Sequence, residues 1–388
     1  MIYLDHNSTS PIDPRVVETI TRTHNLGFLN PASQHRPGQR ARKHLESLRQ
    51  NIVRMLGGQT KGMSADTLLF TSGGTESNNL ALLGLTAYAA ANNEQTAPGD
   101  VLISSIEHPS VVGAAAALKR LGFGVDQLPV DQHGVASTEA LSNWLEQSDN
   151  PLLVSVMLAN NETGVIQPVR EIADLCNKAN VLLHTDAVQW VGKLPVDFGE
   201  LGVDAMSLTA HKLSGPRGIG GLLLRHGLNV EPILFGGFQQ MAMRPGTEDV
   251  ALAAGMEHAM RIAAEDVDRA TRMSDLRDRL ENQLLELHPQ MVINGKAAPR
   301  LPHTSNLSFP GIDRQALLLA ADMNDLAIST GSACASGSSE PSPVLLAMNL
   351  PPDIVRGSIR ISLGAGTTSG EIDQAIASIN RVVENLSK

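Results

Sequence analysis

The chain has 388 residues, of which 42% are hydrophobic and 18% are charged, a balance typical of a globular protein with two or three domains. Its formal net charge of −10 argues against direct binding of nucleic acid, because contacts to phosphates require clustered Lys and Arg side chains. Two cysteines are too few for a disulfide framework, and no apolar run is long enough to span a membrane. We therefore expect a cytoplasmic protein with no membrane partner.

Short apolar runs alternate with amphipathic segments between residues 67 and 225. The runs that predict strands cover residues 67–71, 101–105, 152–158, 181–186, 205–209 and 220–225. The helices predicted between them cover residues 78–91, 111–121 and 170–179. This order is typical of an α/β fold with a mostly parallel sheet, which binds its ligands at the carboxyl ends of the strands.

The pattern changes after about residue 247. A helical stretch with mixed charges over residues 248–287 leads into a more irregular α+β segment, and a last helix is predicted over residues 370–387. We expect a large domain formed by residues 15–258 and a smaller α+β domain formed by residues 1–14 plus 259–388.

The segment SGGTES, residues 72–77, follows the first predicted strand. Two glycines and a threonine at a strand-to-helix junction present free backbone N–H groups and the positive end of a helix, which suits a phosphate group. An ordinary glycine turn with Thr75 as the helix cap would produce the same pattern. The segment alone leaves both interpretations open.

Three ionisable residues also follow predicted strands. Asp186 ends the run VLLHTD, where a carboxylate could keep a pyridinium nitrogen protonated or could cap a helix. Lys212 lies in TAHKLSGPRGIGG, before a glycine-rich turn, where it could form a Schiff base or be an ordinary surface lysine. His108, in IEHPS, could stack on a flat ring and carry protons, although a lone histidine is more often structural.

The two cysteines lie in contrasting sequences. Cys176 falls on the apolar face of a predicted helix with Ile172 and Leu175, which predicts a core residue. Cys334 lies in STGSACASGSSEPS, a stretch rich in Gly, Ser and Ala whose composition predicts a mobile loop. Its thiol is either a nucleophile that moves between two positions or an incidental residue of a connector.

Together with the opening YLDHNSTSPIDPRV, the segments NPASQH and ANNETG and the late segment SIRISLGAGTT, these motifs occur in an order that resembles the NifS/IscS-type cysteine desulfurases. These are pyridoxal-phosphate (PLP) enzymes of fold type I in the class-V aminotransferase group. The resemblance covers essentially the whole chain. It implies a fold of type I, a homodimer, PLP as the cofactor and L-cysteine as the substrate.

The resemblance also implies how the cofactor is held. Lys212 would form the Schiff base with PLP, Asp186 would pair with the ring nitrogen, and His108 would stack on the ring and help to move protons. The remaining cofactor contacts match Gly74, Thr75, Gln189, Thr209, His211 and, toward the phosphate of the other subunit, Thr247.

Substrate binding and sulfur transfer fall on four further positions. Asn161 and Arg360 would hold the amino acid, with assistance from Asn7. The thiolate of Cys334 would attack the substrate sulfur, which leaves a persulfide on Cys334 and free alanine. A sulfur-acceptor protein would then take the sulfur for iron–sulfur cluster assembly or tRNA thiolation. The resemblance implies no metal.

One segment departs from the family pattern, which reads close to GGGQERGxRSGT. The chain has FGGFQQMAMRPGTED over residues 235–249, with Phe238, Gln240 and Pro245 in place of Gly, Glu and Ser. Three alternatives to a desulfurase stay open from the sequence. They are a selenocysteine or cystine lyase, an aminotransferase of the same fold, and a non-catalytic PLP-binding scaffold.

Overall fold

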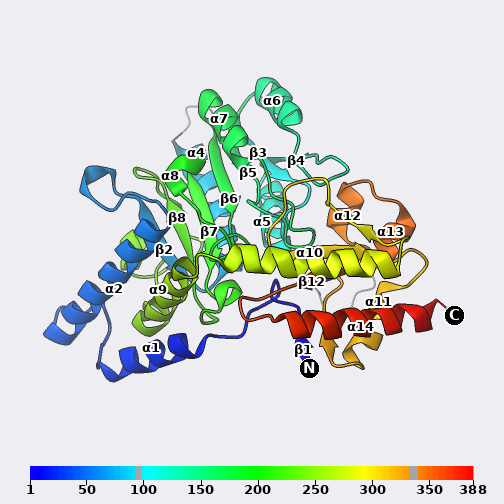
Figure 1. Cartoon of the computed structure of the whole chain (residues 1–388). Helices are drawn as coiled ribbons and strands as arrows, with labels where there is room; N and C mark the ends of the chain where they lie inside the picture. Colours follow the sequence, from blue (N-terminus) through cyan, green and yellow to red (C-terminus); the bar gives the residue numbers. More distant parts are fainter. Residues whose placement is uncertain (93–97, 332–339, 388) are drawn as a thin grey trace.

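A seven-stranded sheet forms the centre of the larger part of the molecule (Figure 1). The computed structural model describes residues 1–92, 98–331 and 340–387. Along the sheet the strands follow the order β2 (Thr67–Thr71), β8 (Gly220–Leu224), β7 (Ala205–Thr209), β6 (Leu182–Asp186), β5 (Pro151–Ser155), β3 (Asp100–Ser104) and β4 (Gly124–Leu128). Neighbouring strands run parallel except at β8, which is antiparallel to both β2 and β7. The expected α/β fold with a mostly parallel sheet is therefore confirmed.

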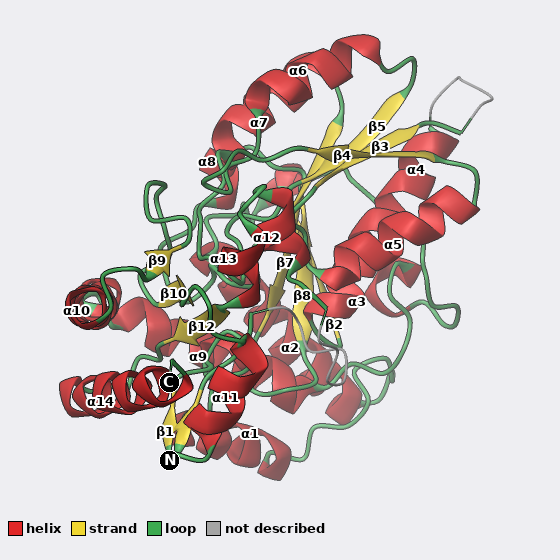
Figure 2. Cartoon of the chain, turned by 90° about the vertical axis from the view of Figure 1, so that its right-hand side faces the viewer, coloured by secondary structure: helices red, strands yellow, loops and turns green. Residues whose placement is uncertain are grey.

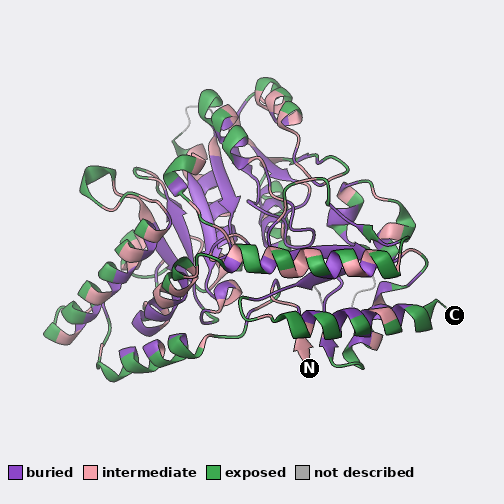
Figure 3. Cartoon of the chain, viewed as in Figure 1, coloured by how far each residue is buried: buried purple, intermediate pink, exposed green. Residues whose placement is uncertain are grey.

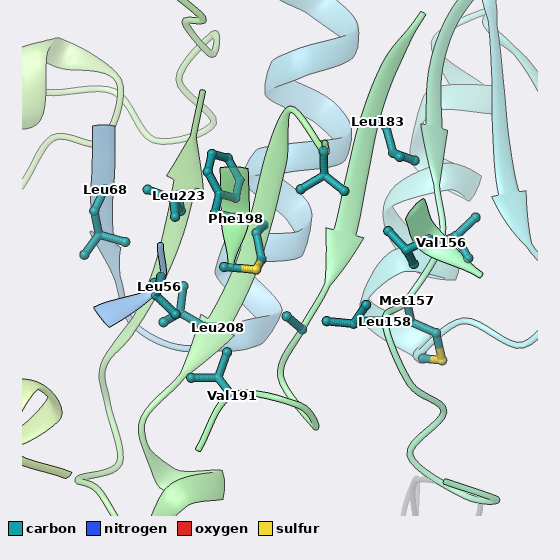
Figure 4. Packing of buried hydrophobic residues seen from close by; sticks show 14 of the residues in the cluster. Leu56, Leu68, Val156, Met157, Leu158, Leu183, Val191, Phe198, Leu208 and Leu223 are labelled. Carbon is teal, nitrogen blue, oxygen red and sulfur yellow. The ribbon is translucent and has the colours of Figure 1, made fainter. Parts of the chain in front are cut away.

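Successive residues of each strand belong to two different hydrophobic clusters. Leu68 and Leu223 pack into one cluster, which Figure 4 shows around Phe198, whereas Leu69 and Leu222 pack into the other. Because side chains alternate along a strand, this pattern places apolar residues on both faces of the sheet. Apart from the edge strand β4, the strands of this sheet are accordingly largely buried, and exposed residues gather on the outward faces of the helices (Figure 3).

Helices cover both faces of this sheet. One face carries α3 (Gly74–Asn79), the π-helical turn η2 (Leu80–Leu85), α4 (Thr86–Ala91) and α5 (Pro109–Arg120). The other carries α2 (Arg36–Met55), α6 (Thr138–Gln147), α7 (Val169–Ala179), α8 (Phe198–Leu201) and α9 (Val250–Glu265), with α1 (Pro14–Asn25) packed on α9. Figure 2 shows α3, α4 and α5 on the opposite side of the sheet from α6, α7 and α8. Among the described residues, no helix combines the length and the apolar character that crossing a membrane requires.

The structure differs from the sequence prediction at four elements. The helix expected from residue 78 begins at Gly74, because α3, η2 and α4 follow one another without a break. The strand expected over residues 152–158 ends at Ser155. The helical stretch expected over residues 248–287 is interrupted between α9 and α10 (Arg269–Leu287), where the poor helix formers Asp266 and Asp268 flank the break. Strand β4 escaped prediction because its sequence GVDQL has a single fully buried residue, so its apolar signal is weak.

The smaller part of the molecule contains a three-stranded antiparallel sheet. Its strands are β12 (Ser358–Ser362), β10 (Thr304–Ser308) and β9 (Val292–Ile293), and the helices of this segment are α10, α11 (Arg314–Asp322), α12 (Pro343–Ala347), α13 (Pro352–Arg356) and α14 (Ser369–Leu386). Both chain ends lie here (Figure 1), and β1 (Ile2–Tyr3) pairs with β11 (Leu326–Ala327).

The hydrophobic clusters bear on the division into domains. Leu4 packs in the same cluster as Leu280 and Val383, which supports joining residues 1–14 to residues 259–388. Val344 and Val355, from α12 and α13, pack instead into the cluster of the large sheet. The boundary at residues 258/259 therefore stays a prediction.

A buried ion pair joins α10 to the small sheet. The guanidinium of Arg300 donates to both carboxylate oxygens of Glu281, at 2.7 and 2.9 Å, and Ser305 Oγ donates to Glu281 Oε1 at 2.7 Å. Both side chains of the pair are almost fully buried. Removing one partner would leave the other charge buried and uncompensated.

We therefore expect Glu281→Gln to lower the free energy of unfolding by about 3–5 kcal/mol, measured by urea denaturation followed by circular dichroism. The matched control is Asp373→Asn, which breaks a pair with Arg279 whose two side chains are both more than one-third exposed. Because exposed pairs contribute little, this control should lower the free energy by no more than about 1 kcal/mol. Equal losses of unfolding free energy in the two variants would show that the buried Glu281–Arg300 pair contributes no more than an exposed pair.

Candidate active site

A cavity of about 530 Å³ opens at the carboxyl ends of β6 and β7 and beside the first residues of α3 and α5. Its position is the one expected for a ligand of a parallel sheet. Predicted site residues that line it are Gly74, Thr75, His108, Asn161, Asp186, Gln189, Thr209, His211 and Lys212. Lining residues that the sequence did not single out include Asn78, Ser110, Met157 and Arg217.

Lys212 lies directly after β7, in the short helical turn η3 (His211–Leu213). Its Nζ donates a hydrogen bond to the backbone carbonyl of Asn7. Burial and the charge of Arg360 lower the pKa of Lys212, the charges of Asp186 and Asp5 oppose the shift, and the resulting pKa is about 8. A fraction of its amine is therefore neutral near neutral pH, which a nucleophilic lysine requires.

Asp186 is the last residue of β6 and is buried at the cavity wall. Its Oδ2 accepts a hydrogen bond from Asn78 Nδ2 at 2.7 Å, and its Oδ1 accepts one from the backbone N–H of Val188 at 2.9 Å. Asn78 Nδ2 also donates to Ser110 Oγ at 2.9 Å, so it fixes Asp186 relative to α5. Asn78 Oδ1 is buried and has no partner within the described part of the chain.

The opposite end of the cavity is suited to an anion. Ser72 and Thr75 lie where the chain enters α3, whose first residue follows Gly73 without a side-chain cap. Arg217 lines the same cavity. Glycine is required where this loop crosses β8, because a Cβ atom on Gly220 would lie 2.7 Å from the backbone carbon of Gly73.

His211 and Thr209 lie across from this loop. His211 Nδ1 lies 3.2 Å from Thr9 Oγ1, which ties the lysine turn to the start of the chain. Burial, followed by the charges of Lys212, Arg217 and Lys193, lowers the pKa of His211 to about 4. The imidazole is therefore neutral near neutral pH and can act as a hydrogen-bond donor without adding charge.

His108 caps the first turn of α5 and faces the cavity. Its Nδ1 accepts a hydrogen bond from the backbone N–H of Ser110 at 3.1 Å, so the neutral ring carries its proton on Nε2. Burial lowers the pKa of His108, with Lys212 adding to the shift and Asp186 opposing it. These shifts favour the neutral form of the His108 imidazole.

The neighbouring Glu107 is a buried carboxyl that the sequence did not reveal. Burial, together with the charge of Asp186, raises its pKa to about 8. Its Oε1 accepts hydrogen bonds from Ser104 Oγ at 2.6 Å and from the backbone N–H of Met157 at 2.7 Å. Glu107 is thus protonated near neutral pH, while Asp186 lies at the cavity.

Asn7, Asn161 and Arg360 come together beside the cavity. Asn7 Nδ2 and Arg360 Nη1 both donate to the backbone carbonyl of Asn161, each at 3.1 Å. Arg360 also forms an ion pair with Asp5 at 2.6 Å, and its Nε has no partner among the residues that the structure describes. Asn161 lines the cavity, whereas Asn7 and Arg360 lie behind it.

Asn7 forms hydrogen bonds to residues from several separate segments of the chain. Its backbone carbonyl accepts hydrogen bonds from Gln189 Nε2, at 3.1 Å, and from Lys212 Nζ. Its side chain donates to Thr304 Oγ1 at 2.9 Å, and its backbone N–H donates to Ser362 Oγ at 2.9 Å. It therefore joins the lysine turn to β10 and β12.

Of the other residues named from the sequence, Thr247 and Cys176 do not line this cavity. Thr247 is exposed and lines a different hollow, beside Phe28. Cys334 lies outside the described residues. Cys176 is fully buried in α7, and burial raises the pKa of its thiol to about 12, so the prediction of a core residue is confirmed.

Residues 235–249, which depart from the family pattern, are fixed to the edge of the sheet. The side-chain amide of Gln240 accepts from the backbone N–H of Phe70 at 2.7 Å and donates to its carbonyl at 2.9 Å. Arg244 donates to both carboxylate oxygens of Glu76 in α3, at 2.7 and 3.1 Å. An amide suits Gln240 because it satisfies both backbone groups of the edge strand, which a carboxylate cannot do.

Metal binding has no support in the part of the chain that the structure describes, where no group of three His, Cys, Asp or Glu side chains could hold an ion.

Comparison with known proteins gives consistent matches over the whole chain. The sequence pattern of the aminotransferase class-V family matches residues 2–375. A cysteine desulfurase IscS from Dictyoglomus turgidum is 37% identical over 386 residues, which are 99% of this chain and 95% of that protein. A cysteine desulfurase NifS from Azotobacter vinelandii is 38% identical over 386 residues, covering 99% and 93%. A solved NifS-like protein from Rickettsia africae superposes with a TM-score of 0.88 at 32% identity, covering 99% of both chains.

The perturbed amine of Lys212 can be tested in the cofactor-free protein. We expect its acetylation by acetic anhydride to be half-maximal near pH 8, measured by mass spectrometry of the Lys212 peptide, with the exposed Lys119 as an internal reference for the reagent. Arg360→Gln should raise this midpoint, because it removes a positive charge, and Asp186→Asn should lower it, because it removes a negative one. A midpoint near the ordinary lysine value of about 10.4, or shifts of the same sign, would contradict this electrostatic account.

Proposed function

We propose that this chain, which belongs to the aminotransferase class-V family and is a cysteine desulfurase within it, binds PLP at Lys212 and transfers the sulfur of L-cysteine to Cys334. The observation that carries the proposal is the convergence of a partly buried lysine, a buried aspartate and a loop suited to an anion on one cavity. An aminotransferase or a lyase of the same fold would share that cavity. The desulfurase relatives, which match over the whole chain, favour the desulfurase.

The cavity offers the groups that PLP requires. Thr75, Thr209 and His211 would hold the phosphate, together with backbone N–H groups at Gly74 and the start of α3. Asp186 would pair with the ring nitrogen. When bound, PLP supplies an electron sink for negative charge at the α-carbon of the substrate.

Gln189 would bind the ring hydroxyl. Its Oε1 is buried and has no partner in the described part of the chain, while its Nε2 is held by Asn7. An unpartnered buried acceptor in a cavity is the feature expected where a ligand hydroxyl donates.

Lys212 and His108 would move protons at the substrate. The lowered pKa of Lys212 provides a neutral amine that can bind the cofactor and later accept the α-proton. His108 would lie over the cofactor ring with a neutral imidazole, so its unprotonated and protonated forms are both accessible during turnover.

Arg360, Asn161 and Asn7 would hold the amino acid. The guanidinium of Arg360 can bind a carboxylate through two parallel hydrogen bonds, and its Nε is unpartnered among the described residues. The side-chain oxygen of Asn7 is also buried without a described partner, so it can accept a hydrogen bond from the substrate amine. Asn161 lines the cavity between the two.

The sulfur step would proceed by thiolate attack. The Cys334 thiolate forms an S–S bond with the substrate sulfur, the C–S bond breaks, and the electron pair left on carbon is protonated to give alanine. The persulfide then passes its outer sulfur to an acceptor protein of iron–sulfur cluster assembly or tRNA thiolation, or to a thiol reductant, which releases sulfide.

The chain would act as a homodimer. Residues 234–241 carry four exposed apolar side chains, those of Leu234, Phe235, Phe238 and Met241, with Phe238 93% exposed. An exposed apolar patch of this kind is typical of a protein interface. Thr247 follows the same segment and is exposed, as expected for a residue that reaches the phosphate in the partner subunit.

The reaction can be tested with PLP-loaded protein, L-cysteine and a thiol reductant, by measuring sulfide and alanine together. We expect equal amounts of both from the wild type, and neither from Cys334→Ala although its cofactor absorbance is kept. Cys176→Ala is the matched control and should retain both products, because its thiol is buried with a pKa of about 12. Products from Cys334→Ala would instead favour a lyase that needs no thiol.

The dimer interface can be tested by Phe238→Glu. A buried charge in an apolar interface should raise the dissociation constant of the dimer by at least about tenfold, measured by sedimentation equilibrium. Met323→Glu is the control, since Met323 is 86% exposed and lies at the end of α11. If the two variants dissociate equally, residues 234–241 are not part of the interface.

A further inference from the structure

A second cavity, of about 360 Å³, lies where the turn after β6 meets the junction of α9 and α10, and we name it the junction cavity. It shares no lining residue with the cavity at Lys212. Most of its lining residues are apolar, among them Leu56, Val191, Met260 and Ala263. Its charged lining residues are Lys193, Asp266 and Arg269.

Arg269 is buried in this cavity without an acceptor. The residue is 6% exposed, and its side chain forms no hydrogen bond or ion pair with any described residue. Asp266 lies nearby, but its two carboxylate oxygens bind Arg272 at 2.8 and 2.7 Å. The charge of Asp266 partly compensates Arg269, but the buried Nε of Arg269 still has no acceptor among the described residues, which points to a ligand that supplies one.

Lys193 adds a second basic group to the same cavity. It is 5% exposed, and its Nζ donates to the backbone carbonyl of Lys212, while no ion pair joins it to a described carboxylate. Burial lowers its pKa well below the ordinary value, and the charges of Arg269 and Lys212 contribute. An anion in the cavity would relieve the repulsion between Lys193 and Arg269.

The groups on the other side of Lys193 supply no negative charge. His6 and His303 are both close enough to feel its charge. Burial, followed by the charge of Lys193, lowers the pKa of His6 to about 4 and that of His303 well below its ordinary value. Both nitrogens of His303 are buried and have no partner among the described residues.

The start of α10 favours an anion at the same place. This helix has 19 residues, and Asp268 at its N-cap makes no side-chain capping bond. Arg269 and Ala270, its first two residues, line the cavity. The positive end of a long helix therefore lies beside the two basic side chains, although the backbone N–H of Arg269 itself donates to the carbonyl of Asp266 at 3.1 Å.

We propose that the junction cavity binds a small organic carboxylate with a short branched aliphatic body. The carboxylate contacts Arg269 and Lys193, and the aliphatic body packs against Leu56, Val191 and Met260. An inorganic oxyanion fits less well, because most of the lining is apolar and offers it no further donors. The volume of the cavity matches that of small-molecule sites.

The test is isothermal titration calorimetry of the PLP-loaded protein with 4-methylpentanoate at constant ionic strength. We expect saturable binding that Arg269→Gln weakens by at least about tenfold, as for loss of a hydrogen bond to a charged group. Arg279→Gln is the matched control, because Arg279 lies on the same helix and pairs with Asp373 at the surface. Equal affinities of the two variants would overturn the proposal.

The ligand class is tested by two analogues. Acetate lacks the aliphatic body and 4-methylpentanamide lacks the charge, so both should bind at least about tenfold more weakly. An amide that binds as tightly as the carboxylate would exclude the anion site.

Arg360→Gln tests whether the probe binds at the substrate site instead. This variant should leave the affinity for 4-methylpentanoate unchanged. Loss of binding would place the probe at the substrate site. Ala263→Leu fills the apolar end of the junction cavity and should abolish binding while Arg269 is kept. Retained binding in this variant would also overturn the proposal.

Discussion

The carbonyl oxygen of Asn7 is the point on which the site depends. It accepts hydrogen bonds from Lys212 and Gln189, which lie on two turns of the large sheet, and the rest of Asn7 binds Thr304 and Ser362 of the small sheet. The lysine turn and the small sheet are thus held in register by one residue near the start of the chain. The opening sequence is therefore part of the site, although it lies about 200 residues from the lysine.

The charges around the cavity are arranged so that few of them compete. Glu107 is protonated near neutral pH because it is buried beside Asp186, so the two carboxyls do not repel each other. His108 and His211 have lowered pKa values for the same reason, burial. Asp186 and Lys212 then line the described cavity without a second ionised carboxylate beside Asp186. In the proposed complex with PLP, this arrangement would favour a cationic ring nitrogen next to Asp186.

Prediction from the sequence succeeded where a polar residue ended an apolar run. Asp186 and Lys212 end or follow strands of a parallel sheet, and the topology then brings them to one edge. Asn78 and Arg217 were missed because nothing in their local sequence separates them from surface residues. Glu107 was missed because its burial comes from long-range packing between β3 and the loop after β5.

Tertiary contacts also decided the elements that the sequence did not resolve. Strand β4 pairs only along one side with β3, so it exposes Asp126 and Gln127 and lacks an apolar pattern. In the sequence, the only sign of the break between α9 and α10 is a pair of aspartates, Asp266 and Asp268, within an otherwise continuous helical pattern. The direction of β8 is set by its pairing with β7 and β2, and strand direction has no local sequence signature.

The reversed direction of β8 sets the path that residues 225–249 take away from the sheet. Because β8 begins at the cavity edge and ends at the opposite edge, the chain leaves the sheet far from its own Lys212. It then passes the edge strand β2, where Gln240 fastens it, and presents Thr247 outward. In the proposed homodimer, this path would make Thr247 available to the phosphate site of the neighbouring subunit, so that a complete site would be a property of the assembly.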